Sequence, residues 1–279
     1  MSTLAGPVHP LDEASLRRAL VVDGGLWRGL EVRAETGSTN ADLATTARAG
    51  APEGLVLVAE HQRAGRGRSG RSWTSPPGAG IAVSVLLRPS PPVPVWGWLP
   101  LLAGVAMAEA VAGHAGLPAT VPATLKWPND LLVGGGKAGG VLAEVVGDAV
   151  VLGVGINVTT RAHELPDPVP GAPPATSLVL AGAVDTRREP LLVALLGGIG
   201  SWYARWTAAG GDPDRCGLRA AYLARCATVG RSVRVLLPGG DERAGAAVTV
   251  DGQGRLVVRG SAGADRAVAA GDVVHLRAG

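Results

Sequence analysis

The most basic segment of the chain, residues 63–73, has the composition of an anion-binding loop. Its arginines are Arg63, Arg66, Arg68 and Arg71, interleaved with glycines and followed by Trp73. Guanidinium groups suit carboxylates and phosphates, and glycine lets a backbone fold closely around a ligand. The spacing also matches G-x-G-x-x-G, but Pro76 and Pro77 cannot open the helix that a dinucleotide-binding turn requires. We therefore predict that this arginine loop is an ordered anion-binding loop.

A second segment, KWPND at 126–130, presents a lysine, an amide and a carboxylate at a strand end. Pro128 favours an extended conformation at the preceding tryptophan, so Asn129 and Asp130 follow directly on a strand. The plainer alternative is a simple turn, because asparagine and aspartate are common after proline. Lys126, immediately before them, favours a functional site.

Three glycine-containing segments carry further polar candidates. Lys137 lies between glycines within 134–144, where its ammonium either meets a ligand or is exposed on a hairpin. Asn157 lies near the end of the apolar run 153–158, where its amide either hydrogen-bonds a ligand or caps the strand. Asn40 ends the sequence GSTN at the predicted start of a helix.

The rarest polar residues fall in these same segments. Of 26 basic residues, only Lys126 and Lys137 are lysines, and the asparagines are Asn40, Asn129 and Asn157. A chain that uses arginine almost everywhere else for positive charge keeps lysine where a compact ammonium is needed. This distribution indicates that the segments belong to one functional site.

The elements that must position these segments are both strands and helices. We predict strands at 31–35, 55–60, 81–88, 123–127, 130–133, 140–146 and 149–158. Helices are predicted at 39–48 after an N-cap at Ser38 or Thr39, across the apolar stretch 99–113, and at 191–209 and 214–226. Five short strands between 232 and 276 predict a small β-barrel of SH3-like type. A boundary near Ala227 gives domains 1–227 and 228–279.

Composition narrows the class of protein. With 279 residues, 47% of them hydrophobic, the chain can bury a sizeable core. The formal net charge of +3 is too small for nucleic-acid binding to be the main activity. The longest apolar stretch falls short of the roughly 20 residues of a membrane span, and no signal peptide is visible. Two cysteines allow one disulfide at most, so we expect a reduced, cytoplasmic protein without a membrane partner.

Taken in order, GSTN, EHQxAGRGRxGRxW, KWPND, KxxGxLxE and GxGINV resemble the catalytic domain of a biotin protein ligase, in a short form without an N-terminal DNA-binding domain. The similarity runs from about Glu31 to Val158, and the predicted barrel extends it to the end of the chain. It implies an α+β fold of the class II synthetase type, with helices packed on a central mixed or antiparallel sheet, plus the small barrel. Five motifs in the family's order are specific, whereas each alone is weak.

The resemblance implies a two-step reaction. Biotin's carboxylate attacks the α-phosphate of Mg-ATP and gives biotinyl-5′-AMP and pyrophosphate. A lysine on the biotin carboxyl carrier domain of an acyl-CoA or pyruvate carboxylase then takes the biotin and releases AMP. The expected cofactor is therefore Mg²⁺, with ATP and biotin as substrates. Because the first step brings two anions together, fixed cations should make the main catalytic contribution.

The resemblance also assigns roles to residues. The catalytic residues are Lys137, Arg66, Arg68 and Asp130. The biotin-binding residues are Ser38, Thr39, Asn40, Gln62, Gly65, Arg66, Arg68, Lys137 and Gly140. The nucleotide-binding residues are Arg68, Arg71, Trp73, Lys126, Asn129, Asp130 and Asn157. Trp73 would stack on adenine, Asn157 would hydrogen-bond it, and Asp130 would accept the acceptor amine's proton or contact Mg²⁺.

Further expectations concern mobility, partners and alternatives. Without ligand, clustered charge and glycines should leave the arginine loop mobile, and the adenylate should order it as a lid. The 36 residues before GSTN are too few for a winged-helix domain, so we expect neither DNA binding nor repressor activity. Both a monomer and a homodimer are compatible with the sequence. The alternatives are a lipoate or octanoate ligase or transferase of the related fold and, from another class, an RNA-binding protein.

Overall fold

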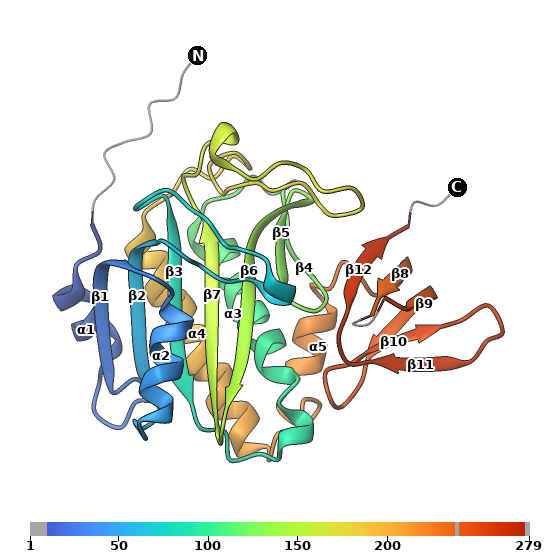
Figure 1. Cartoon of the computed structure of the whole chain (residues 1–279), viewed down its shortest axis with the longest axis horizontal. Helices are drawn as coiled ribbons and strands as arrows, with labels where there is room; N and C mark the ends of the chain where they lie inside the picture. The colour runs from blue at the N-terminus through green and yellow to red at the C-terminus, as the bar shows by residue number, and fades with distance from the viewer. Residues whose placement is uncertain (1–9, 238–239, 277–279) are drawn as a thin grey trace.

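The computed structural model describes residues 10–237 and 240–276, which form two β-sheets (Figure 1). The larger sheet has seven strands in the order β1-β2-β3-β7-β6-β5-β4. Their bounds are β1 Gly29–Thr36, β2 Leu55–Gln62, β3 Gly80–Leu87, β4 Ala123–Lys126, β5 Asp130–Val133, β6 Gly136–Val146 and β7 Ala149–Asn157. β1 and β2 are parallel, and the other neighbouring strands are antiparallel. The predicted mixed sheet is therefore confirmed.

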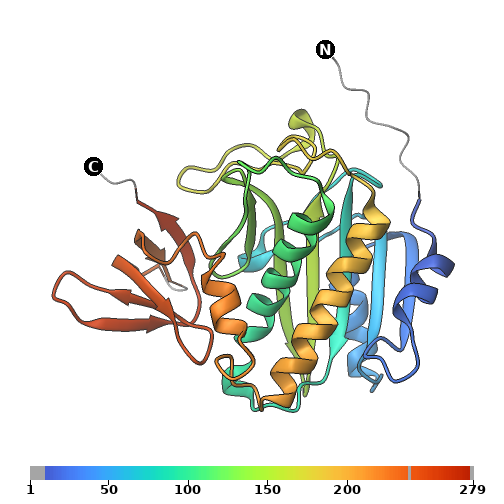
Figure 2. The ribbon, with the colours of Figure 1, turned by 180° about the vertical axis from the view of Figure 1, so that it is seen from behind.

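Helices cover both faces of this sheet. α2 (Thr39–Arg48) lies on the front face in Figure 1, and α3 (Trp98–His114) and α4 (Arg188–Ala208) lie side by side on the opposite face (Figure 2). α1 (Glu13–Leu20) packs beside β1, and α5 (Leu218–Leu223) lies between α3 and the second sheet. Short 3₁₀ helices occupy Arg68–Gly70, Val93–Val95 and Ala162–Glu164.

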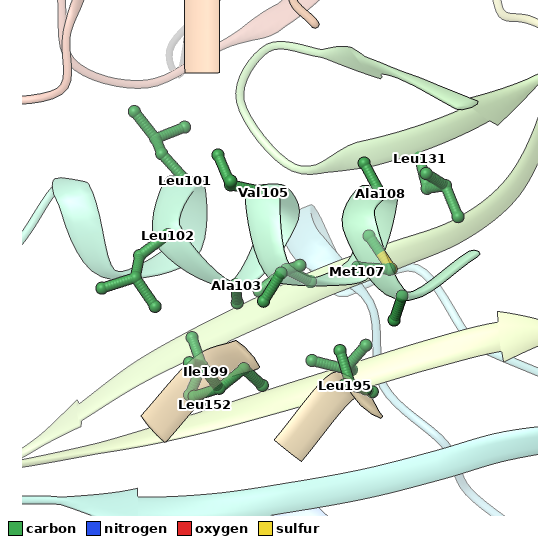
Figure 3. Packing of buried hydrophobic residues seen from close by; sticks show 14 of the residues in the cluster. Leu101, Leu102, Ala103, Val105, Met107, Ala108, Leu131, Leu152, Leu195 and Ile199 are labelled. Atoms are coloured by element: carbon green, nitrogen blue, oxygen red, sulfur yellow. The ribbon is translucent and has the colours of Figure 1, made fainter. Parts of the chain in front are cut away.

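The core is centred on α3. This helix is apolar all round and buried along most of its length, as expected for a helix covered on every side. Figure 3 shows its side chains close to Leu131 and Leu152 of the sheet and to Leu195 and Ile199 of α4. Burying each such leucine contributes about 1.5–3 kcal/mol. The packed helix thereby fixes the strands whose ends carry the polar segments.

By length and composition alone, Val93–His114 could cross a membrane. In the structure this stretch is mostly buried, and its helix packs against the sheet, α4 and α5. It is therefore the core helix that the sequence predicts.

The second sheet follows α5 and is antiparallel throughout, in the order β11-β10-β9-β8-β12. Its strands are β8 Ser232–Leu236, β9 Glu242–Val250, β10 Leu256–Arg259, β11 Asp265–Val268 and β12 Asp272–His275. Two buried indoles attach it to α3 and to the turn after β4: Trp98 Nε1 donates to Gly252 O at 3.1 Å, and Trp127 Nε1 donates to Gly254 O at 3.0 Å. The turn between β9 and β10 is thus docked against the start of α3 and the end of β4.

Both edge strands of the larger sheet have partners from their own chain. Two side chains of α1, Glu13 and Arg17, hydrogen-bond backbone groups of β1 at 2.8 Å each. At the opposite edge, the segment 225–227 pairs with Leu125 of β4.

Two elements differ from the sequence prediction. α1 was not predicted, although Asp12 caps it by accepting from Ser15 N at 3.1 Å. The helix predicted over 214–226 is only α5, because Asp212 accepts backbone N–H groups of the following turn and Gly217 takes a left-handed conformation at φ 76°. The start of the chain, where the sequence shows no signal peptide, lies outside the described residues.

Candidate active site

A cavity of about 420 Å³ lies between the start of α2, the arginine loop, strands β4 to β7 and the second sheet. Among its lining residues are the predicted site residues Ser38, Thr39, Asn40, Gln62, Arg66, Arg68, Arg71, Trp73, Lys126, Asn129, Asp130, Lys137, Gly140 and Asn157. Gly65 is the one predicted site residue outside this lining. Motifs from five separate parts of the chain therefore meet in one place.

The arginine loop folds back on itself at the cavity. Gly67 N donates to Arg71 O at 2.7 Å, and Trp73 N donates to Gly65 O at 2.8 Å. A Cβ atom at position 65 would lie 2.3 Å from Trp73 O, so this crossing of the backbone requires glycine. Gly65 lies beside the cavity, and the close approach that it permits here is to the backbone of Trp73.

Carboxylates from three different strands pair with arginines of this loop. The pairs are Arg63 Nε with Glu35 Oε1 of β1 at 3.3 Å, Arg66 Nη2 with Glu144 Oε1 of β6 at 3.0 Å, and Arg71 with Asp272 of β12. These pairs neutralise charges that would otherwise repel one another. They also tie the loop to both sheets.

Arg68 is the loop arginine that faces neutral groups. Its Nη1 donates to Asn129 Oδ1 at 3.1 Å, and its Nη2 donates to Gly271 O at 3.5 Å. Over residues 10–237 and 240–276, no carboxylate lies within 4.0 Å of its guanidinium. Burial lowers the pKa of Arg68, although the nearby Asp130 opposes this shift. Its charge is therefore available to an anionic ligand.

The KWPND segment places a cluster of charge at the junction of β4 and β5. Asp130 Oδ1 lies 2.6 Å from Lys137 Nζ. Burial lowers the pKa of Lys126, and the Coulombic attraction of Asp130 acts against it. The backbone of the segment is a turn, as the simpler interpretation of KWPND predicts, with a cis peptide between Trp127 and Pro128. Its polar side chains nevertheless line the cavity. Asp130 is the carboxylate near three cations, Lys126, Lys137 and Arg68. The cluster therefore carries an excess of positive charge, which suits a phosphate chain.

A row of hydroxyl and amide groups lines the α2 end of the cavity. Gln62 Oε1 accepts from Thr39 N at 2.9 Å and from Thr39 Oγ1 at 3.0 Å. Ser84 Oγ lies 2.7 Å from Thr39 Oγ1 and 2.6 Å from Asn40 Oδ1. Ser38 begins the helix, with Oγ 3.5 Å from the Ala41 N–H that it caps. The hydroxyls of Thr39 and Ser84 have two protons between them, but they take part in three oxygen–oxygen contacts. The amide oxygens of Gln62 and Asn40 only accept, so one of the three contacts has no proton.

A flat surface and an unused acceptor lie at the other end of the cavity. A Cβ atom at Gly155 would lie 2.5 Å from Trp73 Cε2, so glycine lets the indole ring lie directly on β7. Asn157 Nδ2 donates to Thr176 O at 3.0 Å, whereas its Oδ1 is buried and has no hydrogen-bond partner among the described residues. A buried amide oxygen without a partner is unfavourable, so a ligand donor at this point would be stabilising.

Several residues of the site were missed by the sequence analysis. Ser84 joins the hydroxyl row, and its signal is a lone polar residue inside the apolar strand 80–87. Residues 166–173 of the proline-rich loop and 272–274 of β12 also line the cavity. Only the fold brings these last two segments to the site, since nothing in their composition suggests a ligand. Glu144 is the last residue of the motif KxxGxLxE, but the motif alone does not indicate what its side chain does.

Comparison with known proteins decides the family. The Biotin/lipoate A/B protein ligase family matches residues 36–160, and the biotin protein ligase C-terminal domain matches residues 228–276. A curated protein of Mycobacterium tuberculosis, biotin–[acetyl-CoA-carboxylase] ligase, is 47% identical over 270 residues, which is 96% of this chain and 97% of that protein. The chain belongs to the biotin protein ligase family.

Solved structures of this family share the fold. The biotin protein ligase of Aquifex aeolicus in complex with biotin and ATP is similar with a TM-score of 0.72 and 27% identity, covering 90% of this chain and 100% of that one. The Leishmania major enzyme in complex with biotinyl-5-AMP gives a TM-score of 0.58 and 26% identity, covering 90% and 99% of the two chains. The C-terminal sheet is thus part of the family architecture.

Proposed function

We propose that this chain is an ATP-dependent ligase that activates biotin as biotinyl-5′-AMP and transfers it to a lysine of a biotin carboxyl carrier domain. The main observation in support is that one cavity is lined by the hydroxyl and amide row, by a cluster of cations and by Asn157, whose Oδ1 has no hydrogen-bond partner among the described residues. The 47% identical relative bears the name of such a ligase. The two cysteines are free, which is compatible with the reducing cytoplasm as the place of reaction.

The α2 end of the cavity fits the ureido group of biotin. That group offers two N–H donors and one carbonyl acceptor, and the row of Ser38, Thr39 and Gln62 supplies matching oxygens and hydrogens. Because the row has fewer protons than contacts, a ligand that donates two N–H groups satisfies its surplus acceptors. Biotin's carboxylate then extends toward the cations.

The Trp73 end fits adenine. An exocyclic amine can donate to Asn157 Oδ1, the acceptor that lacks a partner in the described structure. The indole of Trp73 offers a face for stacking. The α-phosphate then lies between the base and biotin, beside the charged cluster.

The cations between the two ends favour attack of one anion on another. Arg68, Lys126 and Lys137 oppose the repulsion between biotin's carboxylate and the α-phosphate and stabilise the charge that builds on phosphorus. Arg66, on the rim, adds a further charge toward the carboxylate or the phosphates. In the second step Asp130 faces the acylated centre, where its carboxylate can orient the acceptor amine and take its proton.

The donor set suits a magnesium ion carried by the nucleotide. Among the described residues, no group of three or more His, Cys, Asp or Glu side chains is arranged to hold a metal. Mg²⁺ in such sites is held by substrate phosphates with one or two carboxylates and waters, and Asp130 supplies one carboxylate in the cavity. Bound there, the ion would neutralise phosphate charge, while Asn129 and Arg68 hold each other beside it.

The alternatives are less well supported. The family match over 36–160 includes lipoate ligases, but the match over 228–276 is specific to biotin protein ligases. An RNA-binding role requires an open basic surface, whereas Arg63, Arg66 and Arg71 are paired with carboxylates. In the described part of the chain, the segment before β1 forms α1, which packs beside β1 of the larger sheet.

The decisive experiment is ATP–pyrophosphate exchange with biotin or lipoate as the acid, followed by transfer of labelled biotin to an apo carrier domain. We expect exchange that requires biotin and label that appears on the carrier lysine. Faster exchange or transfer with lipoate would refute biotin as the substrate.

A further inference from the structure

Glu144 lies at the junction of the arginine loop and the hydroxyl row. It is near the end of β6, and its side chain is 24% exposed. One carboxylate oxygen, Oε2, accepts from Asn40 Nδ2 at 2.9 Å, and the other, Oε1, lies 3.0 Å from Arg66 Nη2. The two bonds connect segments 26 positions apart in the sequence, both of which line the cavity.

The two partners of Glu144 differ in their surroundings. Asn40 is 4% exposed, and its Oδ1 is held by Ser84 while its Nδ2 also lies 3.3 Å from Leu142 O. The side chain of Arg66 is 52% exposed. The carboxylate is therefore anchored on its buried side and holds the loop on its exposed side.

The hydrogen bonds continue from Glu144 into the proposed biotin end of the cavity. They run through Asn40, Ser84 and Thr39 to Gln62, with successive distances of 2.9, 2.6, 2.7 and 3.0 Å. The group that ends this row is thus also the group that holds a loop arginine. Resting on the proposed function, we infer that Glu144 is a positioning residue that fixes Arg66 relative to the biotin pocket for adenylate formation.

The chemistry requires a carboxylate at this position. Two donors converge on its two oxygens, and a glutamine of the same size offers only one acceptor beside an NH₂ group. In Glu144→Gln the amide oxygen will face Asn40, because a buried donor cannot turn to water, and the NH₂ will face Arg66. This variant therefore releases the loop and leaves the hydroxyl row intact, whereas Glu144→Ala disturbs both.

A matched control exists on the same loop. Glu35 pairs with Arg63 at 3.3 Å, but neither residue lines the cavity. Glu35→Gln therefore removes a more exposed ion pair of the same loop and alters the contact of Glu35 Oε2 with His61 Nδ1, but it removes no residue of the cavity lining or the hydroxyl row.

The first measurement is trypsin cleavage after the loop arginines in the protein without ligands. We expect Glu144→Gln to be cleaved about 1.5 to 5 times faster than the native protein, the range for a partly exposed ion pair, and a smaller change for Glu35→Gln. Bound biotin plus ATP should abolish the difference. The difference in cleavage without ligands holds or fails whether or not the protein ligates biotin.

The second measurement is the steady-state rate of adenylation. In Glu144→Gln the KM for biotin and the KM for ATP should both rise by the same factor with kcat unchanged, because a smaller fraction of molecules has Arg66 in place beside the carboxylate and the phosphates. In Glu144→Ala the KM for biotin should rise further than in Glu144→Gln, because the hydroxyl row is disturbed as well. Equal behaviour of Glu144→Gln and Glu35→Gln in both measurements, or a loss of kcat with both KM values unchanged, would overturn the inference. Failure of biotin-dependent exchange in the native protein would instead overturn the proposed function.

Discussion

The unpaired oxygen of Asn157 predicts which nucleotide the site accepts. Its amide is oriented by the bond from Nδ2 to Thr176 O at 3.0 Å, so Oδ1 remains as a buried acceptor. Adenine presents an amine to such an acceptor, whereas guanine and hypoxanthine present a carbonyl oxygen. With either of these bases two acceptors face each other and neither finds a hydrogen.

The size of the effect follows from the cost of an unsatisfied buried acceptor. That cost is about 1–3 kcal/mol, so kcat/KM for ATP should exceed that for GTP or ITP by a factor of about 5 to 150. Asn157→Ala removes the acceptor. We expect it to lower the rate with ATP, to leave the rate with ITP nearly unchanged, and so to bring the ratio close to one.

The assay is biotin-dependent pyrophosphate exchange with each nucleoside triphosphate. Asn129→Ala is the matched control, because both ends of the Asn129 amide are already bonded, to Arg68 and to Val141 O. It should slow exchange with every nucleotide and leave the ratio unchanged. Equal use of ATP and ITP by the native protein, or an unchanged ratio in Asn157→Ala, would refute the assignment of this oxygen to adenine.

Four further predictions concern the remaining features. Lys137→Met should slow adenylation by about 10²- to 10³-fold, the usual effect of losing one preorganised charged contact, and unchanged single-turnover rates of both steps would remove Lys137 from the site. Biotin plus ATP should protect the arginine loop of the native protein from proteolysis, and equal cleavage with and without ligand would refute the lid. Burial lowers the pKa of His275 to about 4, so the contribution of its neutral form to the free energy of unfolding is fully present above the unfolded pKa near 6.5 and is lost as pH falls toward 4. Melting curves at pH 7 and 4.5 should show a larger loss of stability for the native protein than for His275→Gln. The difference should be about 1 kcal/mol after allowance for the partial exposure of His275. Gel-shift assays should show no sequence-specific binding to duplex DNA, and a tight specific complex would restore the repressor interpretation.

The sequence predicts the elements that have regular patterns. The apolar strands and the buried helix have clear periodicity, and the strands appear with bounds shifted by a few residues. α1 escaped prediction because only Leu16 and Leu20 of its eight residues are buried, which leaves too short an apolar stripe to stand out. The shortened α5 reflects local competition, since the side chain of Asp212 bonds the backbone that a longer helix would use.

Some residues of the candidate site could likewise be predicted from the sequence, and others could not. The lysines and asparagines were predicted because no other positions of the chain have these residue types, and the loop arginines because they cluster between glycines. Glu144 and Asp272 were not, because each acts through a partner more than 75 positions away in the sequence, Arg66 and Arg71 respectively. Ion pairs that join distant segments depend on the fold, and nothing in the local sequence of either carboxylate indicates them.

The occupied edges of the larger sheet limit how this protein can associate with others. An edge strand with free N–H and C=O groups is a template on which another chain can add a strand. Here side chains of α1 take up backbone groups of β1, and the segment 225–227 pairs with β4. Strand addition at either edge would first have to displace these contacts. For the larger sheet, association with another chain through side chains on one of its faces requires no such displacement.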